Sequence, residues 1–170
     1  MADFRKSTVY QVYPKSFYDS NGDGLGDLRG ITEKLDYIRD LGADYIWITP
    51  FFVSPQNDNG YDVEDYYKID PRYGTMEDFE ELAREAGKRG IRLMLDMVFN
   101  HTSTRHEWFR KAMEGDEAYK DFYIFRKGKA PGVPPTNWES KFGGSAWEYV
   151  ERFDEYYLHL FDVTQADLNW

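Results

Sequence analysis

The first hundred residues contain three short apolar runs, separated by two stretches in which apolar positions recur every three or four residues. The runs at residues 9–14, 43–50 and 91–101 predict strands. The stretches at residues 28–38 and 76–86 predict helices, with Gly42 and Gly90 ending them and Thr75 opening the second. Because each strand is joined to the next through a helix, we expect parallel pairing with right-handed crossovers.

The third run, residues 91–101, is almost entirely apolar, which predicts a strand buried on both faces. Asp96 interrupts the run, and Asn100, His101 and Thr102 follow one another at its end. Ligand sites in parallel α/β folds lie outside the carboxyl ends of the strands. Asp96 and His101 are therefore candidate site residues. The alternative is that backbone donors hold Asp96 as a buried carboxylate and that His101 only caps the strand.

The regular alternation of strands and helices stops after His101. Residues 102–120 favour a helix, residues 127–135 form a loop rich in Gly, Pro and Lys, and residues 156–161 favour a strand. The predicted fold class is α/β. Residues 1–101 are expected to supply the first strands and helices of a (β/α)8 TIM barrel, a fold that needs about 250 residues. Residues 102–170 are expected to form an irregular domain inserted after the third strand.

Oxygen-bearing side chains recur at alternate positions in the segment 19–27, with glycines between them. This spacing lets several oxygens surround one hard cation such as Ca²⁺. The segment begins like an EF-hand loop, but a strand precedes it and its twelfth position lacks the Glu of an EF-hand. The prediction is a structural calcium site, and the alternative is a Gly/Asp turn without metal. The predicted ligands are the side chains of Asp19, Asn21, Asp23 and Asp27 and the carbonyl of Leu25.

Composition and charge restrict the classes of function. Aromatic residues make up 18% of the chain, which suits contacts with sugars or other large planar surfaces. The net charge of −10 argues against nucleic acid as a partner. There is no Cys, which excludes disulfides, thiolate zinc sites and thiol nucleophiles. No run is apolar enough for a signal peptide or a membrane span, so we expect a soluble, cytoplasmic protein.

Several blocks resemble the α-amylase family of glycoside hydrolases. Residues 96–101, Asp-Met-Val-Phe-Asn-His, resemble the family's first conserved block, and residues 165–169 resemble a short block late in its inserted domain B. Residues 9–17, 19–24 and 59–62 are similar to the oligo-1,6-glucosidase and α-glucosidase branch. Within that branch, residues 135–147 and 161–170 look most like the trehalose-6-phosphate hydrolases, although relatives more often carry Pro in place of Ala166. The resemblance runs from about Val9 to Trp170.

The resemblance implies a retaining hydrolase with a carboxylate nucleophile, a Glu general acid/base and a third carboxylate that stabilises the transition state. In relatives these groups follow the fourth, fifth and seventh strands, so they are expected beyond Trp170. The segment Arg152-Phe153-Asp154 echoes the nucleophile block, but no apolar strand leads into it, and we interpret it as a solvated turn. We therefore expect no catalytic residue in this chain, which by itself should be inactive and requires the remainder of the barrel.

The resemblance also implies a set of substrate-binding residues. By resemblance, Asp62 and His101 would bind hydroxyls of the glucose on the nonreducing side of the cleavage point. The Asp62 carboxylate can accept two hydroxyl protons at once. The other expected members are Tyr61 against the sugar ring and Phe142 and Gln165 closing the site from domain B. The alternatives are ordinary core aromatics for Tyr61 and Phe142 and an exposed loop carboxylate for Asp62.

A phosphorylated disaccharide would also need a cationic partner. Lys141, beside Phe142, is the basic residue placed next to a pocket block, and a solvated surface Lys is its alternative role.

The function expected from the sequence is hydrolysis of trehalose 6-phosphate to glucose and glucose 6-phosphate. An oligo-1,6-glucosidase or α-glucosidase is one alternative. Another is a non-catalytic amylase-like domain, such as the ectodomain of an amino-acid transporter heavy chain, which would be expected to lose Asp62 and His101. A third is a free calcium-binding module, which predicts that 170 residues fold stably with metal bound, whereas an incomplete barrel exposes open sheet edges.

Overall fold

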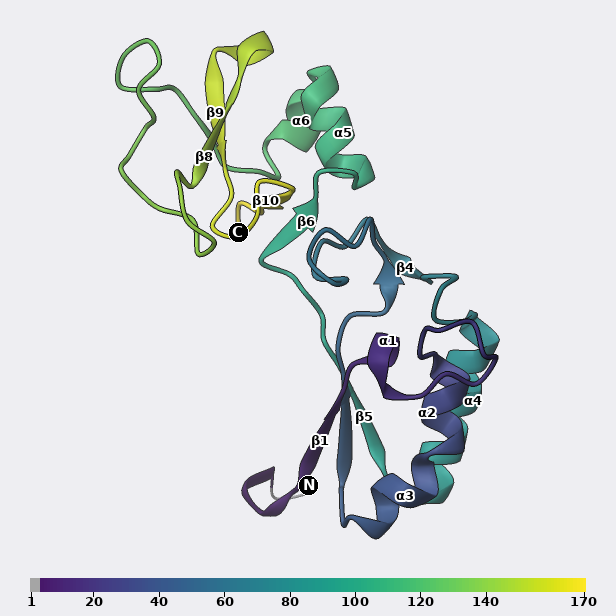
Figure 1. The fold of residues 1–170 in the computed structure, drawn as a ribbon. Helices are drawn as coiled ribbons and strands as arrows, with labels where there is room; N and C mark the ends of the chain where they lie inside the picture. Colours follow the sequence, from purple (N-terminus) through teal and green to yellow (C-terminus); the bar gives the residue numbers. More distant parts are fainter. Residues whose placement is uncertain (1–3) are drawn as a thin grey trace. The chain divides into compact units, whose positions relative to one another are not determined.

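The computed structural model describes residues 4–170, and the contacts within the chain divide them into two compact units (Figure 1). The first unit comprises the described part of Met1–Val53 together with Tyr66–Met97. The second comprises Ser54–Asp65 and Val98–Trp170. The contacts thus change units at residue 98, close to the predicted boundary after residue 101. They also group the loop Ser54–Asp65 with the second unit.

The first unit is built on a three-stranded parallel sheet in the order β1-β2-β5. Val9 pairs with Tyr45, and Tyr45 pairs with Arg92. This confirms the three predicted strands and their parallel pairing. A second, two-stranded sheet pairs β3 with β4. The strands are β1 (Val9–Val12), β2 (Tyr45–Ile48), β3 (Phe52–Val53), β4 (Asp65–Ile69) and β5 (Arg92–Leu95).

The expectation that the third strand is buried on both faces is wrong. Arg92 is exposed and the next three residues of β5 are only half-buried, whereas Ile46 and Ile48 of β2 are fully buried. The reason is the position of β5 at the edge of the described sheet, where it has one neighbouring strand. The strand also ends at Leu95 and does not reach His101.

Helices α2, α3 and α4 cover one side of this sheet (Figure 1). The predicted helix over residues 28–38 is interrupted at Lys34, although Leu28, Ile31, Leu35 and Ile38 are all fully buried, as its apolar stripe predicts. The helices of the unit are η1 (Phe4–Lys6), α1 (Pro14–Phe17), α2 (Leu28–Glu33), α3 (Leu35–Asp40) and α4 (Met76–Lys88).

The predicted start of α4 at Thr75 is confirmed, with a complete capping box. The Asp78 backbone N–H donates to Thr75 Oγ1, and the Thr75 backbone N–H donates to the Asp78 carboxylate. Arg29 of α2 also donates to Asp78, at 2.6 Å, so the same carboxylate both starts α4 and joins it to α2. Leu82 and Ala86 are buried, whereas Met76, at the start of the predicted apolar stripe, is exposed.

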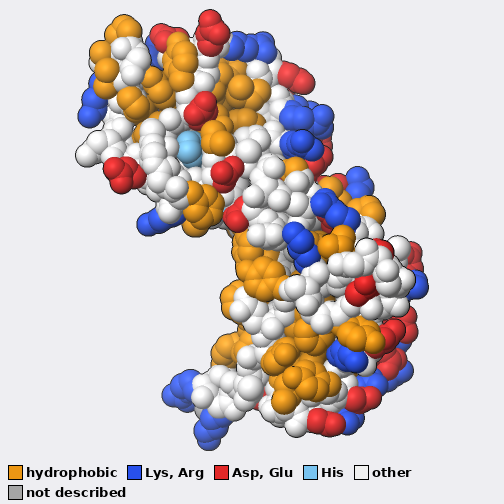
Figure 2. Space-filling model, viewed as in Figure 1, with side chains coloured by type: hydrophobic (Ala, Val, Ile, Leu, Met, Phe, Trp, Pro, Cys, Tyr) orange, Lys and Arg blue, Asp and Glu red, His pale blue; other side chains and the backbone are white. Residues whose placement is uncertain are grey.

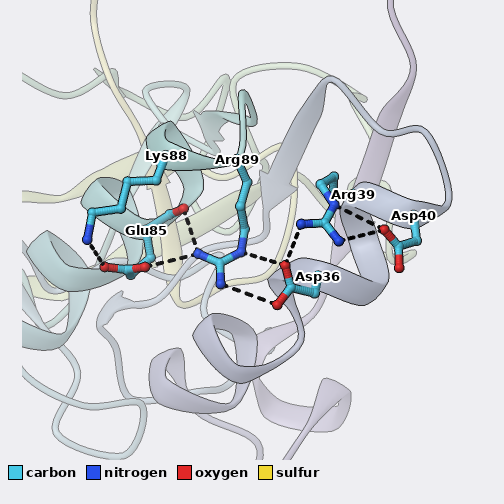
Figure 3. Close-up of polar contacts among 6 residues, drawn as sticks. All are labelled: Asp36, Arg39, Asp40, Glu85, Lys88 and Arg89. Carbon is cyan, nitrogen blue, oxygen red and sulfur yellow. Dashed lines mark hydrogen bonds and ion pairs between the residues drawn. The ribbon is translucent and has the colours of Figure 1, made fainter.

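The start of α3 and the end of α4 are joined by an ion pair that is only partly shielded from solvent (Figure 3). Arg89 donates to Asp36 of α3 at 2.9 Å and to Glu85 of α4 at 3.0 Å, and Asp36 also receives a bond from Arg39 at 2.8 Å. Because these groups are in contact with solvent, salt screens them and their contribution to stability is small.

The second unit contains an antiparallel sheet in the order β7-β9-β8 and a separate antiparallel pair of β6 with β10. Its core includes the ring of Phe109, whose centroid lies 5.1 Å from those of Tyr123 and Tyr157. The elements are β6 (His101–Ser103), α5 (Glu107–Glu114), α6 (Glu117–Lys120), β7 (Phe125–Arg126), β8 (Trp147–Val150), η2 (Glu151–Phe153), β9 (Glu155–Leu158) and β10 (Gln165–Asp167).

The expectation of one helix over residues 102–120 is wrong. The segment begins with β6, and its helical part is divided into α5 and α6. Gly115 stands between them at φ 94°, a left-handed conformation that ends an α-helix and that glycine adopts without strain.

Hydrophobic side chains are visible on the surface of the molecule (Figure 2). Exposed large ones include Tyr67 in the first unit and Phe142 and Trp138 in the second. Along residues 4–170, no helix combines the length and the apolar character needed to cross a membrane.

Candidate functional site

Asp62 lies in the loop that follows β3, and its own loop encloses its carboxylate. The side chain is fully buried, so the alternative of an exposed loop carboxylate is excluded. Ser54 Oγ donates to Oδ1 at 2.9 Å, and the backbone N–H of Asp58 donates to the same oxygen at 3.1 Å. The backbone N–H of Asn57 donates to Oδ2 at 2.9 Å. These bonds hold the carboxylate in one orientation.

The loop needs an unusual backbone to turn around this carboxylate. Gln56 and Asn59 have positive φ angles of 64° and 47°, and Gly60 has a φ of 99°. Gly and Asn tolerate this left-handed region better than other residues do, which explains the Asn-Gly pair immediately before Tyr61.

His101 contacts the same loop. Its ring is buried, and Nε2 lies 3.0 Å from the carbonyl oxygen of Tyr61, the residue before Asp62. Burial lowers the pKa of His101 below its usual value, because the apolar surroundings disfavour the charged ring. The structure therefore brings three of the predicted site residues together: Tyr61, Asp62 and His101.

The predicted position of His101 at the tip of the third strand is wrong. The strand β5 ends at Leu95, and His101 is the first residue of β6, which pairs antiparallel with β10. Asp96, the other candidate in that run, accepts a bond from the indole Nε1 of Trp47 at 3.1 Å, which anchors the end of β5 to β2.

Gln165 joins β10 to the loop that carries Asp62. Its side chain is fully buried, and both ends of its amide have partners in the protein. Oε1 accepts from the backbone N–H of Asp162 at 2.8 Å, and Nε2 donates to Asp58 Oδ2 at 2.9 Å. One N–H of the amide remains for a further acceptor. Asp58 is a member of the site that the sequence did not single out.

Phe142 packs against Phe161, which in turn packs against His101. Its ring is exposed and lies 6.2 Å from the ring of Phe161 in an edge-on arrangement. The Phe161 ring in turn lies 5.3 Å from the ring of His101. Phe161 was not predicted as a site residue, although it stands in the block 161–170 that carries the family resemblance.

Lys141 precedes Phe142, and its backbone is held in place. Its N–H donates to the carbonyl of Leu160 at 2.8 Å, which holds residues 140–142 alongside the segment that leads to Phe161. The Lys141 side chain is exposed. An ammonium group in this position is available to a ligand that contacts Phe142.

Asn100 and Asp167 form a further polar contact beside His101 that the sequence did not identify. The Asn100 amide nitrogen lies 3.1 Å from Asp167 Oδ1 and 3.2 Å from His101 Nδ1. Asp167 is buried, and this burial raises its pKa to about 6. The adjacency of Asn100 to His101 was a usable signal, but the pairing of Asp167 with His101 across β6 and β10 requires the structure.

The segment Arg152-Phe153-Asp154 has a structural role. The Arg152 guanidinium donates to the carbonyls of Met113 and Glu114, at 2.9 and 2.6 Å, and so binds the carboxyl end of α5. Asp154 ends η2 in a left-handed conformation and accepts from the Tyr149 hydroxyl at 3.0 Å. These contacts agree with the interpretation of this segment as a turn.

The predicted calcium loop in the first unit is curled by hydrogen bonds to its own carboxylates. Asp19 accepts from the backbone N–H groups of Gly24 and Gly22, at 2.8 and 2.7 Å, and these bonds lower the pKa of Asp19. Asp27 caps α2 as predicted, accepting from the Gly30 N–H at 2.6 Å. Its other oxygen accepts from Ser20 Oγ at 2.8 Å.

Among residues 4–170, no three His, Cys, Asp or Glu side chains are grouped closely enough to hold a metal ion. The predicted calcium set depends in addition on the Asn21 amide oxygen and the Leu25 carbonyl, so calcium binding stays a prediction.

Comparison with known proteins gives consistent matches across the chain. Residues 11–170 match the sequence model of the Alpha-amylase family, described as the alpha amylase catalytic domain. A trehalose-6-phosphate hydrolase of Bacillus subtilis is 61% identical over 168 residues, which are 98% of this chain and 30% of that protein. An oligo-1,6-glucosidase of Heyndrickxia coagulans is 55% identical over 168 residues, with the same two shares.

Solved structures are similar in fold as well. The crystal structure of Bacillus licheniformis trehalose-6-phosphate hydrolase matches with a TM-score of 0.93 and 63% identity, covering 98% of this chain and 30% of that chain. A mutant of MutB in complex with its substrate sucrose matches with a TM-score of 0.92 and 53% identity, covering 98% and 30%. The chain thus spans about 30% of the length of the relatives it matches.

Proposed function

Because the chain belongs to the alpha-amylase family, we propose that it supplies the sugar-binding wall of a retaining glycoside hydrolase. The proposed reaction is hydrolysis of trehalose 6-phosphate to glucose and glucose 6-phosphate. The support is the identity of 61% to a trehalose-6-phosphate hydrolase of Bacillus subtilis, against 55% to an oligo-1,6-glucosidase. We assign no nucleophile or general acid/base to this chain, whose contribution is to bind and orient the substrate.

The observation that carries the proposal is the convergence of loop 54–62, β6 and β10 on one polar cluster. His101 contacts the Tyr61 carbonyl, and Gln165 contacts Asp58. A glucose ring presents several hydroxyls, which an oriented carboxylate and amide can bind through directed hydrogen bonds. Among residues 4–170, Asp62 Oδ2 accepts from one protein donor and Oδ1 from two. Because the side chain is fully buried, a sugar hydroxyl would reach Oδ2 only if the loop at residues 54–62 moved.

The contribution of His101 is constrained by its existing contacts. Its ring nitrogens already face Asn100 and the Tyr61 carbonyl, so a sugar hydroxyl would share Nε2 with that carbonyl. We therefore assign His101 two roles. The first is to hold the Tyr61–Asp62 peptide in place. The second role is direct contact of its ring with the sugar.

Aromatic and cationic groups complete the proposed site. Tyr61 and Phe142 would lie against apolar faces of the sugar, and Phe161 supports the Phe142 ring. Lys141 would meet the phosphate. In a chain with a net charge of −10, a dianionic group needs a local cation, and Lys141 presents one beside Phe142.

We further propose that the loop at residues 19–27 holds a structural Ca²⁺ ion. The predicted ligands are all oxygens, which a hard cation prefers. The lowered pKa of Asp19 keeps its carboxylate ionised, as binding would require. Bound calcium would neutralise the clustered carboxylates of this loop. We also propose that the protein is located in the cytoplasm, where sugar phosphates are found.

The reaction is tested by incubating the intact protein separately with trehalose 6-phosphate and with isomaltose. Release of glucose and glucose 6-phosphate from the first, with slow or no cleavage of the second, supports the proposal. Efficient cleavage of isomaltose without cleavage of trehalose 6-phosphate would instead support an oligo-1,6-glucosidase. Cleavage of neither sugar, by a folded protein, would contradict a hydrolase.

A further inference from the structure

Three side chains form a row of hydrogen bonds that ends at the backbone of Tyr61. The row begins at Asp167 Oδ1, 3.1 Å from the Asn100 amide nitrogen. The same nitrogen lies 3.2 Å from His101 Nδ1, and His101 Nε2 lies 3.0 Å from the Tyr61 carbonyl oxygen. All of these contacts lie inside the second unit.

The chemistry of the two end groups decides where the proton of the imidazole lies. A carbonyl oxygen can only accept a hydrogen bond, so Nε2 of His101 must carry the proton that points at Tyr61. An amide nitrogen can only donate, so one proton of Asn100 goes to the Asp167 carboxylate and the other to Nδ1 of His101. The contact with the Tyr61 carbonyl and the contact with the Asn100 amide therefore require the same neutral tautomer, with the proton on Nε2. The lowered pKa of His101 agrees with a neutral ring.

The fold brings these groups together from distant parts of the chain. In the antiparallel pairing of β6 with β10, Asp167 stands directly opposite His101. The backbone N–H of Leu168 also donates to the carbonyl of Asn100 at 3.0 Å, which holds Asn100 beside the end of β10. The Asp167 carboxylate receives a second, longer bond from the Leu160 N–H at 3.4 Å.

We propose that Asn100 and Asp167 are positioning residues that hold His101 in the Nε2–H tautomer, so that its ring fixes the Tyr61 carbonyl and the adjacent Asp62. Asp167 orients the Asn100 amide, and the N–H of that amide favours an unprotonated Nδ1 on His101. An acceptor in place of the Asn100 amide would favour a proton on Nδ1 of His101. The consequence for sugar binding rests on the proposed function, whereas the tautomer itself does not.

His106 and His159 provide internal references for the ring nitrogen that carries the proton. His159 Nδ1 lies 3.1 Å from the carbonyl oxygen of Phe161, which requires a proton on Nδ1. His106 Nδ1 accepts from the backbone N–H of Trp108 at 3.1 Å, which requires that Nδ1 is bare. His101 should therefore resemble His106 and differ from His159 in the ring nitrogen that carries the proton when each ring is neutral.

The test is nitrogen NMR of the intact protein labelled at the histidine rings, with ring signals assigned through bonds to the backbone and checked with His106→Gln and His159→Gln variants. The expected result is a proton on Nε2 of His101 and on Nδ1 of His159. A proton on Nδ1 of His101 in the unsubstituted protein would overturn the proposal, and this measurement needs no variant at the site to fold.

Two variants test the role of the row. Asn100→Asp replaces the donor with an acceptor, so the His101 proton should move to Nδ1, or the ring should become doubly protonated with a raised pKa. Asp167→Asn keeps an oxygen that accepts from Asn100 and should preserve the Nε2–H tautomer. An unchanged His101 signal in folded Asn100→Asp would overturn the proposal.

Kinetics then separates this inference from the proposed function. If the row positions Asp62, Asn100→Asp should raise KM for the sugar substrate while the cooperative unfolding transition is retained. An unchanged KM would contradict the positioning role. Absence of any glucosidase activity in the unsubstituted protein would reject the proposed function and leave the tautomer result standing.

Discussion

The Gln165 side-chain amide donates to a carboxylate oxygen of Asp58 at 2.9 Å, across 107 positions of sequence. This contact connects β10 to the loop that encloses Asp62. The same amide accepts from the N–H of Asp162, three residues earlier, so one buried side chain connects two segments and holds the turn before β10. The orientation of the candidate site therefore depends on a contact that neither segment reveals by itself.

Substituting Gln165 with Met removes both hydrogen bonds while nearly preserving the side-chain volume. Because the partners Asp58 and Asp162 are half-buried and water can replace part of each lost bond, we expect the free energy of unfolding to fall by about 1–3 kcal/mol. Urea denaturation of the intact protein measures this change. Asn137→Ala, at an exposed position of the same unit, serves as control and should change stability by less than about 0.5 kcal/mol. Equal effects of the two substitutions would show that the Gln165 contacts are unimportant for folding.

Substituting Lys141 with Ala tests the phosphate contact. If its ammonium binds the phosphate, loss of a charge-assisted hydrogen bond should raise KM for trehalose 6-phosphate roughly tenfold. KM for an unphosphorylated aryl glucoside should stay the same. Lys129→Ala, another exposed lysine of the second unit, is the matched control. A similar change in KM for both substrates would remove Lys141 from the phosphate site.

Asp167 makes stability depend on pH in a defined direction. Burial raises its pKa to about 6, above the value of about 3.9 expected in the unfolded chain. Between these values the folded protein binds more protons than the unfolded chain, so this group lowers stability as pH rises from about 4 to 6. Asp167→Asn removes the effect, so its stability relative to the unsubstituted protein should increase by about 1–3 kcal/mol between pH 4 and pH 7.

Denaturant titrations of Asp167→Asn and of the unsubstituted protein at pH 4 and pH 7 measure this difference. The contributions of the other titrating groups are largely the same in both proteins and cancel. A stability difference that is the same at both pH values would show that Asp167 titrates normally.

Calcium should stabilise the protein if the loop at residues 19–27 binds it. A ligand at 100 times its dissociation constant adds about 2.7 kcal/mol to the free energy of unfolding, which is seen as a rise in Tm. Asp23→Ala removes an expected ligand and should abolish this rise. Asp40→Ala, at an exposed carboxylate on α3, should leave it intact. Calorimetry that detects no binding of calcium to the unsubstituted protein would reject the site.

The regular part of the fold was accessible from the sequence because its signals are local. The strand at Ile46 and Ile48, the Thr75 capping box and the Asp27 cap each follow from residues a few positions apart, and the parallel pairing follows from the alternation of strands and helices. The burial of β5 was overestimated because burial depends on neighbouring strands, which a single apolar run does not contain. The helix is interrupted at Lys34 although the apolar stripe on either side of it is buried as predicted, and no residue near Lys34 signals the break.

The candidate site was accessible only in part. Asp62 and His101 were identified from their blocks, but His101 was placed at the end of a parallel strand. Its true position depends on antiparallel pairing with β10, whose partner residues are more than sixty positions away. Asp58 and Phe161 looked like ordinary residues of a loop and a strand. Their contacts to Gln165 and His101 are what mark them as members of the site.

The most direct test of the central claim is a double-mutant cycle on the competitive inhibition constant of glucose, with Asp62→Asn, His101→Gln and the double variant. If the two residues act at one sugar site, each substitution should weaken glucose binding. Their effects should also be coupled by roughly 0.5–3 kcal/mol, because His101 fixes the peptide that carries Asp62. Folded single variants that both bind glucose as tightly as the unsubstituted protein would contradict the account.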